Sequence, residues 1–479
     1  MMLLLRRLVG MIPQILVYLL FFFVPLQTVY LLMTPMIGKP EGIWQYGVIG
    51  LYGTDILALF LVIYAIVIRV GKRHSLNSAQ NVFERIPLKL LVCGWVIVCG
   101  WSLIALTWAP AGWASLYAIV RIIEVGLIVW AMRQLTWPWV GACSALVSMA
   151  ALQGMLAWHQ YLNQHIGANK WLGLAYHSSR ELGDSVVENV LRRFLRAYGT
   201  FAHPNMLGIY LAIALVICFA LVWCVKKKWQ GYLLLIAWMS IVSGLILTFS
   251  RAGWIAALVG SLGFLVTKLM MRKHVRIFSE HHQGFGMLMV VSSIIVIGAL
   301  GYGLWEPVST RLGIGGLQRL ETMSLQERGT SISEGVNIAQ SSLPFGVGLG
   351  QYTYTVYLKD KTQHHEKPSY SYQPTHAVPL LIVSELGVAG IVGLICIVVG
   401  LVWLVMVRIK TIVSEFDAVR VSLSVSLLLV LIVAMMSDHF LWTTHVGTIL
   451  VATVMTLFLA VPSRPAAVYA LSSPTIFSK

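Results

Sequence analysis

Residues 204–225 read PNMLGIYLAIALVICFALVWCV, and this stretch decides the class of fold. It contains no charged residue, and it has the length of a helix that crosses the hydrocarbon core of a bilayer, which is roughly 30 Å thick. The rest of the chain has the same character, since 58% of its 479 residues are hydrophobic and only 11% are charged. Soluble domains typically carry about 25% charged residues. The sequence therefore predicts an all-α polytopic membrane protein.

The same apolar pattern recurs along the chain and gives about twelve predicted transmembrane helices. These spans lie approximately at residues 13–33, 46–68, 88–108, 112–132, 138–158, 204–225, 231–249, 252–271, 285–305, 377–407, 418–437 and 443–462. They divide the chain into helices 1–5 (residues 1–158), an outer loop (159–203), helices 6–9 (204–305), a larger outer loop (306–376), and helices 10–12 with a tail (377–479). Irregular backbone must leave the hydrocarbon or line a protected cavity. We therefore expect the two long loops to cap a cavity.

The formal net charge of +16 is distributed in a way that indicates membrane topology. The basic residues cluster in alternate loops, at residues 6–7, 72–73, 226–228, 272–273 and 408–410. Lys and Arg accumulate in short loops on the cytoplasmic side of a membrane. We therefore expect an integral protein of the cytoplasmic (inner) membrane, with both termini cytoplasmic and both long loops extracytoplasmic. The same distribution argues against a nucleic-acid partner.

Neither the cysteines nor the N-terminus changes this interpretation. The six cysteines all lie in or beside predicted spans, at Cys93, Cys99, Cys143, Cys218, Cys224 and Cys396. Their spacing matches no zinc site, so we expect small packing residues. The N-terminus resembles a signal peptide, but its apolar run is too long and no small-residue cleavage site follows it. We interpret it as the first transmembrane helix.

Two arginines at the predicted outer boundary of the membrane are candidates for binding an anion. Arg251 follows Thr248-Phe249-Ser250, and Ala252-Gly253 after it leave the backbone open to close approach. Arg196 precedes Gly199 and the next predicted helix start. A guanidinium binds phosphate oxygens with two parallel hydrogen bonds, which a lysine cannot match. The alternative for Arg251 is a long side chain that anchors a helix end at the membrane surface.

His376 lies where the larger outer loop meets the tenth predicted span. An imidazole titrates near neutrality, so it can take the proton of a sugar hydroxyl as a general base. The alternative is a polar cap at the membrane interface. Glu385 follows nine residues later, about two and a half helical turns along, which is too far for direct contact with His376. The role of Glu385 is left open.

Further ionisable residues lie inside or between the spans. Asp55, Arg121 and Glu124 fall within predicted spans, where charged groups are costly. Arg121 and Glu124 are three residues apart, so we expect a structural pair that neutralises itself. Residues 438–445, which begin with Asp438 and include two histidines, form the outer turn between the last two spans and are candidates to line the same cavity.

The loops also contain patterns whose ordinary explanation is the stronger one. Residues 364–366 (HHE) resemble metal ligands, but they stand among lysines and are expected to be solvated. The alternating glycines of residues 344–352 (PFGVGLGQY) resemble half of a dinucleotide fingerprint. No strand–turn–helix pattern surrounds them, so we reject nucleotide binding. Arg192 and Arg193 are as well explained by a solvated loop as by a site.

Four short motifs occur in an order that resembles a known family. They are GTFAHPN (199–205), TFSR (248–251), PFGVG (344–348), and His376 followed by ELG (385–387). The order is similar to that of O-antigen ligases and related polymerases, over roughly residues 196–390. One residue departs from the pattern, because the family often has a small polar residue after the histidine and this chain has Ala377.

The resemblance implies a membrane-embedded, metal-independent glycosyltransferase that needs no cofactor. Its donor would be a glycan on undecaprenyl diphosphate, and its acceptor a glycan, a lipid or a protein. The implied diphosphate-binding residues are Arg196, Arg251 and Arg328, and the implied supporting residues are Glu385, Asn205 and Ser250. His376 would deprotonate the acceptor hydroxyl, which displaces the lipid diphosphate with inversion at the anomeric carbon.

Three classes of function remain open at this stage. The enzyme class includes ligation of a glycan to a lipid core, polymerisation of repeat units and transfer to a protein. A twelve-span transporter is the second class, and it predicts polar residues at the membrane midplane rather than at the outer boundary. The third is a non-catalytic scaffold for envelope assembly, which would tolerate the loss of Arg251 and His376 together.

Overall fold

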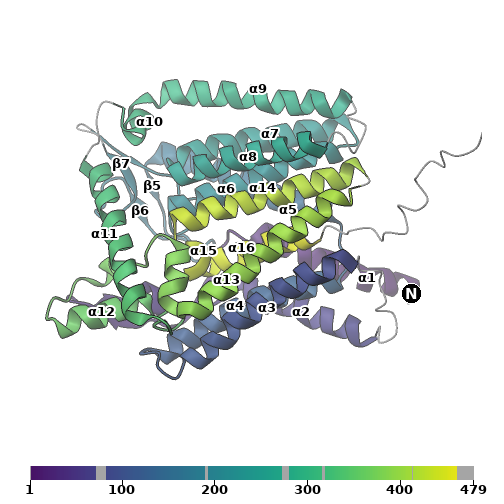
Figure 1. Ribbon diagram of the computed structural model, residues 1–479. Helices are drawn as coiled ribbons and strands as arrows, with labels where there is room; N and C mark the ends of the chain where they lie inside the picture. Colours follow the sequence, from purple (N-terminus) through teal and green to yellow (C-terminus); the bar gives the residue numbers. More distant parts are fainter. Residues whose placement is uncertain are drawn as a thin grey trace, which may run out of the picture.

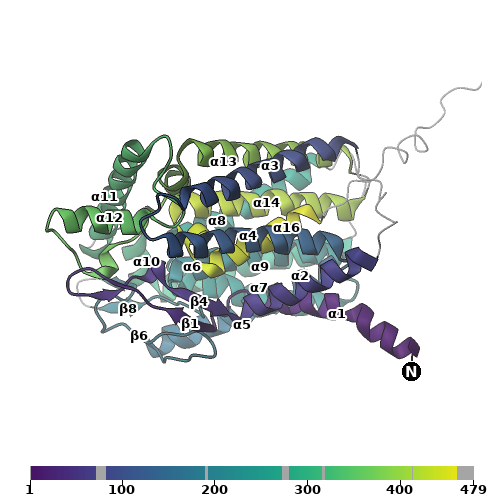
Figure 2. The same ribbon diagram turned by 90° about the horizontal axis from the view of Figure 1, so that it is seen from below.

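The structure is a computed structural model that describes residues 2–71, 82–188, 192–271, 280–314, 319–412 and 414–460. Within these residues the chain is a bundle of long helices, and its strands form only short antiparallel pairs (Figure 1, Figure 2). The predicted all-α membrane fold is confirmed in this form. The predicted basic pairs at residues 72–73 and 272–273, and the last part of the tail at 461–479, lie outside the described residues.

Ten helices in the described part of the chain are long and apolar enough to cross a membrane. They are α2 (Gly53–Gly71), α3 (Val82–Ala105), α4 (Gly112–Gln134), α5 (Trp139–Asn163), α6 (Pro204–Leu221), α7 (Lys228–Leu247), α8 (Arg251–Met271), α9 (Glu280–Gly303), α13 (Val378–Lys410) and α14 (Glu415–Ser437). Two further predicted spans coincide with shorter apolar helices, Met11–Phe23 within α1 (Met2–Phe23) and α16 (His445–Leu459). The count of twelve and the sidedness of the loops stay predictions.

The first two predicted spans extend beyond the helices that the chain forms. Helix α1 ends at Phe23 and α2 begins at Gly53, whereas the predicted spans reach residues 33 and 46. The apolar residues in between form strand β1 (Val29–Met33), which pairs antiparallel with β4 (Ile49–Tyr52). Hydrophobicity alone does not distinguish such a strand from the end of a spanning helix, because both are apolar runs.

Most of the remaining elements gather at the end of the bundle opposite the N-terminus (Figure 1, Figure 2). We call this the loop end, and it comprises residues 164–188, 192–203, 304–314 and 319–377. Its elements are the paired strands β5 (His165–Ile166) and β6 (His177–Ser178), the paired strands β7 (Val186–Glu188) and β8 (Arg193–Leu195), and helices α10 (Trp305–Leu312), α11 (Arg319–Ser342) and α12 (Tyr352–Thr362). The remaining short elements are β2 (Met36–Ile37), β3 (Gly42–Ile43), η1 (Gln45–Gly47), η2 (Val222–Cys224), η3 (Ser369–Ser371), which belongs to the loop end, and α15 (Phe440–Thr443). Both predicted long loops therefore lie at one end.

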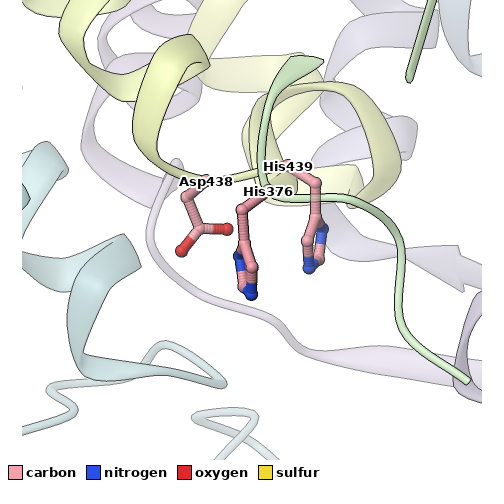
Figure 3. Close-up of side chains that lie close together, drawn as sticks. All are labelled: His376, Asp438 and His439. Atoms are coloured by element: carbon pink, nitrogen blue, oxygen red, sulfur yellow. The ribbon is translucent and has the colours of Figure 1, made fainter. Parts of the chain in front are cut away.

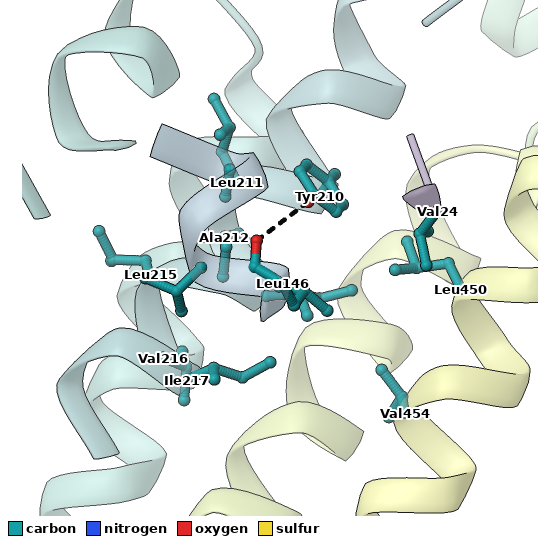
Figure 4. Packing of buried hydrophobic residues seen from close by; sticks show 14 of the residues in the cluster. Val24, Leu146, Tyr210, Leu211, Ala212, Leu215, Val216, Ile217, Leu450 and Val454 are labelled. Carbon is teal, nitrogen blue, oxygen red and sulfur yellow. Dashed lines mark hydrogen bonds between the residues drawn. The ribbon is translucent and has the colours of Figure 1, made fainter. Parts of the chain in front are cut away.

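Helix α6 is the centre of the core. Every residue from Pro204 to Leu221 is buried, as expected for a helix that is apolar on all sides. It packs against α5, α7, α8 and α14. The hydroxyl of Tyr210 donates a hydrogen bond to the carbonyl oxygen of Leu146 at 3.3 Å (Figure 4). Because α6 is buried along its whole length, the position of its first turn is fixed, and this turn lies at the loop end.

Helix α13 is interrupted where the loop 344–348 (PFGVG) packs against it. Gly387 has φ 58° and ψ −142°, which breaks the helical geometry. The N–H of Val388 donates to the carbonyl oxygen of Pro344 at 2.9 Å, and two N–H groups of the loop donate to carbonyl oxygens of α13. A Cβ on Gly387 would lie 2.1 Å from the Pro344 oxygen. Two motifs that are distant in sequence thus form one structural unit.

Replacement of Gly387 by alanine should destabilise the protein. The new Cβ collides with the Pro344 carbonyl and the positive φ disfavours any L side chain, so we expect a loss of about 1–3 kcal/mol in the free energy of unfolding. Gly100→Ala is the matched control, because Gly100 lies in helix α3 and no other segment of the described chain comes within 4 Å of its added Cβ. Unfolding in detergent measures the stability of both variants. Equal stability of the two would contradict the conclusion that Gly387 is required for the contact between α13 and the loop 344–348.

Candidate functional site

Asn205, the second residue of α6, connects three separate segments. Its Oδ1 accepts hydrogen bonds from Arg196 Nη2 at 2.7 Å and from Ser250 Oγ at 3.2 Å. Its Nδ2 donates to Asp438 Oδ2 at 3.2 Å. Pro204 is favoured in a first helical turn and starts α6 at this point, which fixes the position of the amide. Two of the motifs and the turn after α14 therefore converge on one side chain.

Two glycines allow α6 and α8 to approach each other below Asn205. A Cβ on Gly253 would lie 2.9 Å from the Cα of Gly208, and a Cβ on Gly208 would lie 2.9 Å from the Cβ of Ser250. The sequence predicted a close backbone approach after Arg251. The structure shows that the partner in this approach is a neighbouring helix, and its effect is to bring Ser250 to Asn205.

His376 lies beside Asp438 and His439, which come from the turn after α14 (Figure 3). One ligand-type atom from each of the three side chains lies within 4.8 Å of the other two. Nδ1 of His376 is buried and has no hydrogen-bond partner in the described part of the chain. His439 is held at both ring nitrogens, by Thr443 Oγ1 at 2.8 Å and Tyr46 Oη at 3.4 Å. A metal ion bound by all three side chains would displace one of the hydrogen-bond partners of His439. A proton, in contrast, can be accepted by His376 alone.

Burial sets the charge states of this cluster. It lowers the pKa of His376 below the ordinary value of 6.5, although the charge of Asp438 opposes the shift. It also lowers the pKa of His439, to about 4. Burial acts to raise the pKa of Asp438, but the positive charges that His439 and His203 take up at acid pH, together with the hydrogen bond from Asn205, lower it. At neutral pH two uncharged imidazoles thus lie beside an ionised carboxylate, and an uncharged imidazole accepts protons.

His203 caps the N-terminus of α6. Its Nδ1 accepts a hydrogen bond from the backbone N–H of Asn205 at 3.1 Å, so the ring proton lies on Nε2. Nε2 therefore donates to Ser185 Oγ, 3.0 Å away. Burial, and then the charge of Arg196, lower the pKa of His203 to about 3. Ser185 is not activated as a nucleophile, because the ring nitrogen that faces it is a donor.

A second group of charges lies where α8 begins. Oε2 of Glu321 is 3.1 Å from Nη2 of Arg251, and Oε1 of the same carboxylate pairs with Arg311. Arg311 also donates from Nε to the carbonyl oxygen of Phe249 at 2.8 Å. One carboxylate serves two guanidinium groups, so one positive charge is not balanced within the group. The side chain of Arg251 is 29% exposed and is accessible to a ligand.

Arg196 and Arg328 add to this positive charge. Arg196 is 5% exposed, and both of its acceptors, a backbone carbonyl and the Asn205 amide, are neutral. Burial, and then the charges of Arg311 and Arg328, lower the pKa of Arg196 well below its ordinary value. Arg328 also contributes, after burial, to the lowered pKa of Arg311 and of His376, which places it within electrostatic reach of both. Buried cations without a carboxylate partner favour an anionic ligand.

Glu385 lies outside this cluster and anchors a loop. Its Oε2 accepts a hydrogen bond from Trp442 Nε1 at 2.9 Å, and its carboxylate accepts from the backbone N–H groups of Gly350 and Tyr352. These contacts tie the glycine-rich loop and α15 to α13. The structure therefore gives Glu385 structural contacts, and a supporting part for it in the reaction stays a prediction.

A separate, partly buried network joins α2, α4 and α16. Nη1 of Arg121 lies 2.5 Å from Asp55 Oδ1, 2.8 Å from Glu124 Oε2 and 3.1 Å from His445 Nδ1. The Arg121–Glu124 pair was expected from the spacing of the two residues, and Asp55 and His445 extend it. Asp55, Glu124 and His445 could together hold a metal ion. The guanidinium of Arg121 already supplies a cation among them, which favours a structural network.

The structure brings most of the predicted site residues into one region. Direct hydrogen bonds join Arg196, Asn205 and Ser250. His376 and Arg251 are linked to this group through the neighbours described above. Sequence reasoning missed Arg311 and Glu321, which belong to the larger loop. No motif marks these two residues, and the only available signal was their charge in a loop expected to cap a cavity.

These features define a class, an integral membrane protein with an anion-attracting site and a neutral imidazole at one end of its helical bundle. A family model described as O-Antigen ligase matches residues 235–395, about a third of the chain. The match confirms the predicted resemblance over these residues and supports the assignment of this chain to the O-antigen ligase family. It includes three of the four motifs, and GTFAHPN lies before it. No curated protein matches the chain.

Replacement of Asn205 by alanine should destabilise the loop end. Arg196 and Asp438 would each lose a buried hydrogen bond, so we expect the free energy of unfolding to fall by about 1–3 kcal/mol. Asn163→Ala is the matched control, because Asn163 is exposed and donates only to His159 on its own helix. Thermal unfolding in detergent compares the two, and a control that is as unstable as Asn205→Ala would contradict this role.

Proposed function

We propose that this protein is a glycosyltransferase that moves a glycan from undecaprenyl diphosphate to an acceptor hydroxyl, in the manner of an O-antigen ligase. The family match supports a membrane glycan-processing function of the ligase or polymerase type. The observation that carries the proposal is His376, a neutral and half-buried imidazole whose buried Nδ1 has no hydrogen-bond partner in the described part of the chain. It lies within electrostatic reach of Arg328, which belongs with Arg196, Arg251 and Arg311 to the arginine cluster of the loop end. A neutral imidazole accepts the proton of a hydroxyl, and guanidinium groups bind phosphate oxygens.

The arginines provide the charge that the donor requires. A lipid diphosphate is a good leaving group when fixed cations stabilise the negative charge that develops on it. Arg251 and Arg328 are partly exposed, so these two side chains contact the diphosphate. Arg196 is only 5% exposed and adds its charge within electrostatic reach of Arg328. No metal ion is needed in this scheme, because the guanidinium groups supply the positive charge.

His376 activates the acceptor. One of its ring nitrogens takes the proton of the acceptor hydroxyl, and the oxygen attacks the anomeric carbon of the donor sugar from the face opposite the diphosphate. The new C–O bond forms as the bond from carbon to the phosphate oxygen breaks, and the electron pair leaves with the diphosphate. The anomeric configuration is inverted. Asp438 stabilises the imidazolium that results, because its charge raises the pKa of His376.

Two alternatives remain for the same chain. A repeat-unit polymerase would use the same donor chemistry and differ only in its acceptor. A transporter of a lipid-linked or small solute is an alternative of a different class. It would need exchangeable charges within the spans, whereas the partly buried charges at Arg121 already pair with one another. The surplus positive charge of Arg251 and Arg311, which share Glu321, lies at the loop end and favours the enzyme.

Loss of His376 or Arg251 should greatly slow transfer in proteoliposomes that contain a labelled undecaprenyl-diphosphate glycan and EDTA. We expect His376→Ala to lower the rate by roughly 10²–10⁴, the usual value of a general base. Arg251→Ala should lower it by roughly 10²–10³, the effect of removing one donor to a developing oxyanion. A ladder of product sizes would indicate a polymerase, and a single transfer would indicate a ligase.

Two control variants test whether the loss of transfer is specific to the site residues. His365→Ala removes a histidine from an exposed part of the larger loop, and Arg85→Ala removes an exposed arginine from α3. Both should transfer at the wild-type rate. Wild-type transfer by a folded His376→Ala protein would contradict the base assignment. Movement of the lipid or of a solute without any product would favour the transporter.

The rate of transfer should depend on pH through His376. The pKa of His376 is lowered, so the rate should fall on the acid side with a midpoint below 6.5. Asp438→Asn removes a charge that raises this pKa, so the acid midpoint should move to still lower pH and the maximal rate should fall with the weaker base. The pH profile of the rate measures both effects.

Asp360→Asn is the control for this shift. Asp360 lies in α12 and pairs with Lys367, so its loss should leave the acid midpoint unchanged. An acid midpoint that is the same in wild type and Asp438→Asn, or one that moves to higher pH in the variant, would contradict the electrostatic role of Asp438.

A further inference from the structure

A recess of about 840 Å³ opens at the loop end, beside the end of α5 and strand β8. It combines apolar and aromatic side chains with arginines. The apolar and aromatic residues are Tyr161, Leu162 and Phe194, and the arginines are Arg180, Arg192 and Arg193. The mechanism proposed above uses none of these residues. Their combination suits a ligand that is both anionic and apolar.

The recess carries a surplus of positive charge. Nε of Arg193 is 3.4 Å from Glu188 Oε2, but Glu188 is shared with Arg319, whose Nη2 lies 2.9 Å from Oε1. Arg180 adds a further positive charge, the guanidinium of Arg192 also lines the recess, and none of the residues that line it is acidic. Guanidinium groups bind phosphate through paired hydrogen bonds, so the charge and geometry suit a phosphate group.

The recess lies at the end of α5, which is a candidate membrane span. Tyr161 and Leu162 belong to the last turn of the candidate span Trp139–Asn163, and Leu162 is 70% exposed. The adjacent loop exposes Trp171 (72%) and Tyr176 (56%). Exposed Trp and Tyr are typical of the boundary between membrane and water. A lipid in the adjoining leaflet can therefore reach the recess from the side.

Hydrogen bonds of Gln164 hold the recess in shape. Gln164 ends α5 in the left-handed conformation, with φ 54°. Its Oε1 accepts a hydrogen bond from the N–H of Leu195 at 2.7 Å, and its carbonyl oxygen accepts from the N–H of Ser179 at 3.1 Å. Gln164 thus connects the end of α5 to both strand pairs. The recess is therefore formed before any ligand binds.

We propose that this recess binds the phosphate-bearing headgroup of an anionic membrane phospholipid. The arginines hold the phosphate, and the apolar residues at the end of α5 contact the first part of the acyl chains. The recess is distinct from the cluster at Asn205, because Arg196 turns inward to Thr248 and Asn205 instead of lining it. The inference holds whether or not the proposed glycan transfer is correct.

Lipid retention tests the inference. The full-length protein is purified with equal amounts of phosphatidylglycerol and phosphatidylcholine, and native mass spectrometry measures the lipids that stay bound. Wild type should retain phosphatidylglycerol preferentially. Arg180→Gln combined with Arg192→Gln should lower this preference by about tenfold or more, since each basic residue near a membrane surface strengthens the binding of anionic lipid. Arg180→Lys with Arg192→Lys keeps the charge and should retain part of the preference.

Lys170→Gln is the matched control, because Lys170 is an exposed cation in the same loop that does not line the recess. Its preference should equal that of wild type, and millimolar inorganic phosphate should not displace the lipid. Equal retention of both lipids by wild type would overturn the proposal. So would a full preference in the double Gln variant. Displacement by inorganic phosphate would identify a site for a soluble anion instead.

Discussion

The side-chain amide of Asn205 accepts hydrogen bonds from Arg196 and Ser250 and donates one to Asp438. It holds a buried cation on one side and a buried carboxylate on the other, and these are groups that are costly to bury without partners. An amide can satisfy both because it carries an acceptor and a donor. The position of the amide depends on α6, which is buried along its whole length and begins one residue earlier. The arrangement of Asp438 beside His376 therefore rests on the packing of the core.

The position of His376 is also constrained by helix α13, which follows it in the sequence. Helix α13 begins two residues after this histidine and breaks at Gly387, where the loop 344–348 supplies the hydrogen bonds that the helix loses. Glu385 strengthens the same junction through its hydrogen bond with Trp442, close in sequence to the turn that carries Asp438. The motifs that resembled a family signature thus divide into two kinds. Some contribute charges to the site, and others hold the segments that carry those charges.

Much of the fold and part of the site could be predicted from the sequence. The spanning helices were predictable because a long apolar run has few alternatives in a membrane. The β1–β4 pair was not, because its strands continue the apolar runs of the neighbouring helices. Asn205 and His376 could be singled out because they occur in the ordered motifs, and Arg196 because it lies three residues before the first of them. The pairing of Glu321 with two arginines was missed because it depends on how the larger loop folds onto α8. The break at Gly387 was also not predicted, because the sequence around it is a continuous apolar run that is typical of an uninterrupted helix.

The central claim is that the arginine cluster at the loop end binds a lipid diphosphate next to His376. The most direct test is an experimental structure of the protein with undecaprenyl diphosphate bound. The account predicts phosphate oxygens within hydrogen-bond distance of Arg251 and Arg328, with an open position beside His376 for the acceptor hydroxyl. A diphosphate bound elsewhere, for example at the opposite end of the bundle where Arg408 pairs with Glu84, would contradict it.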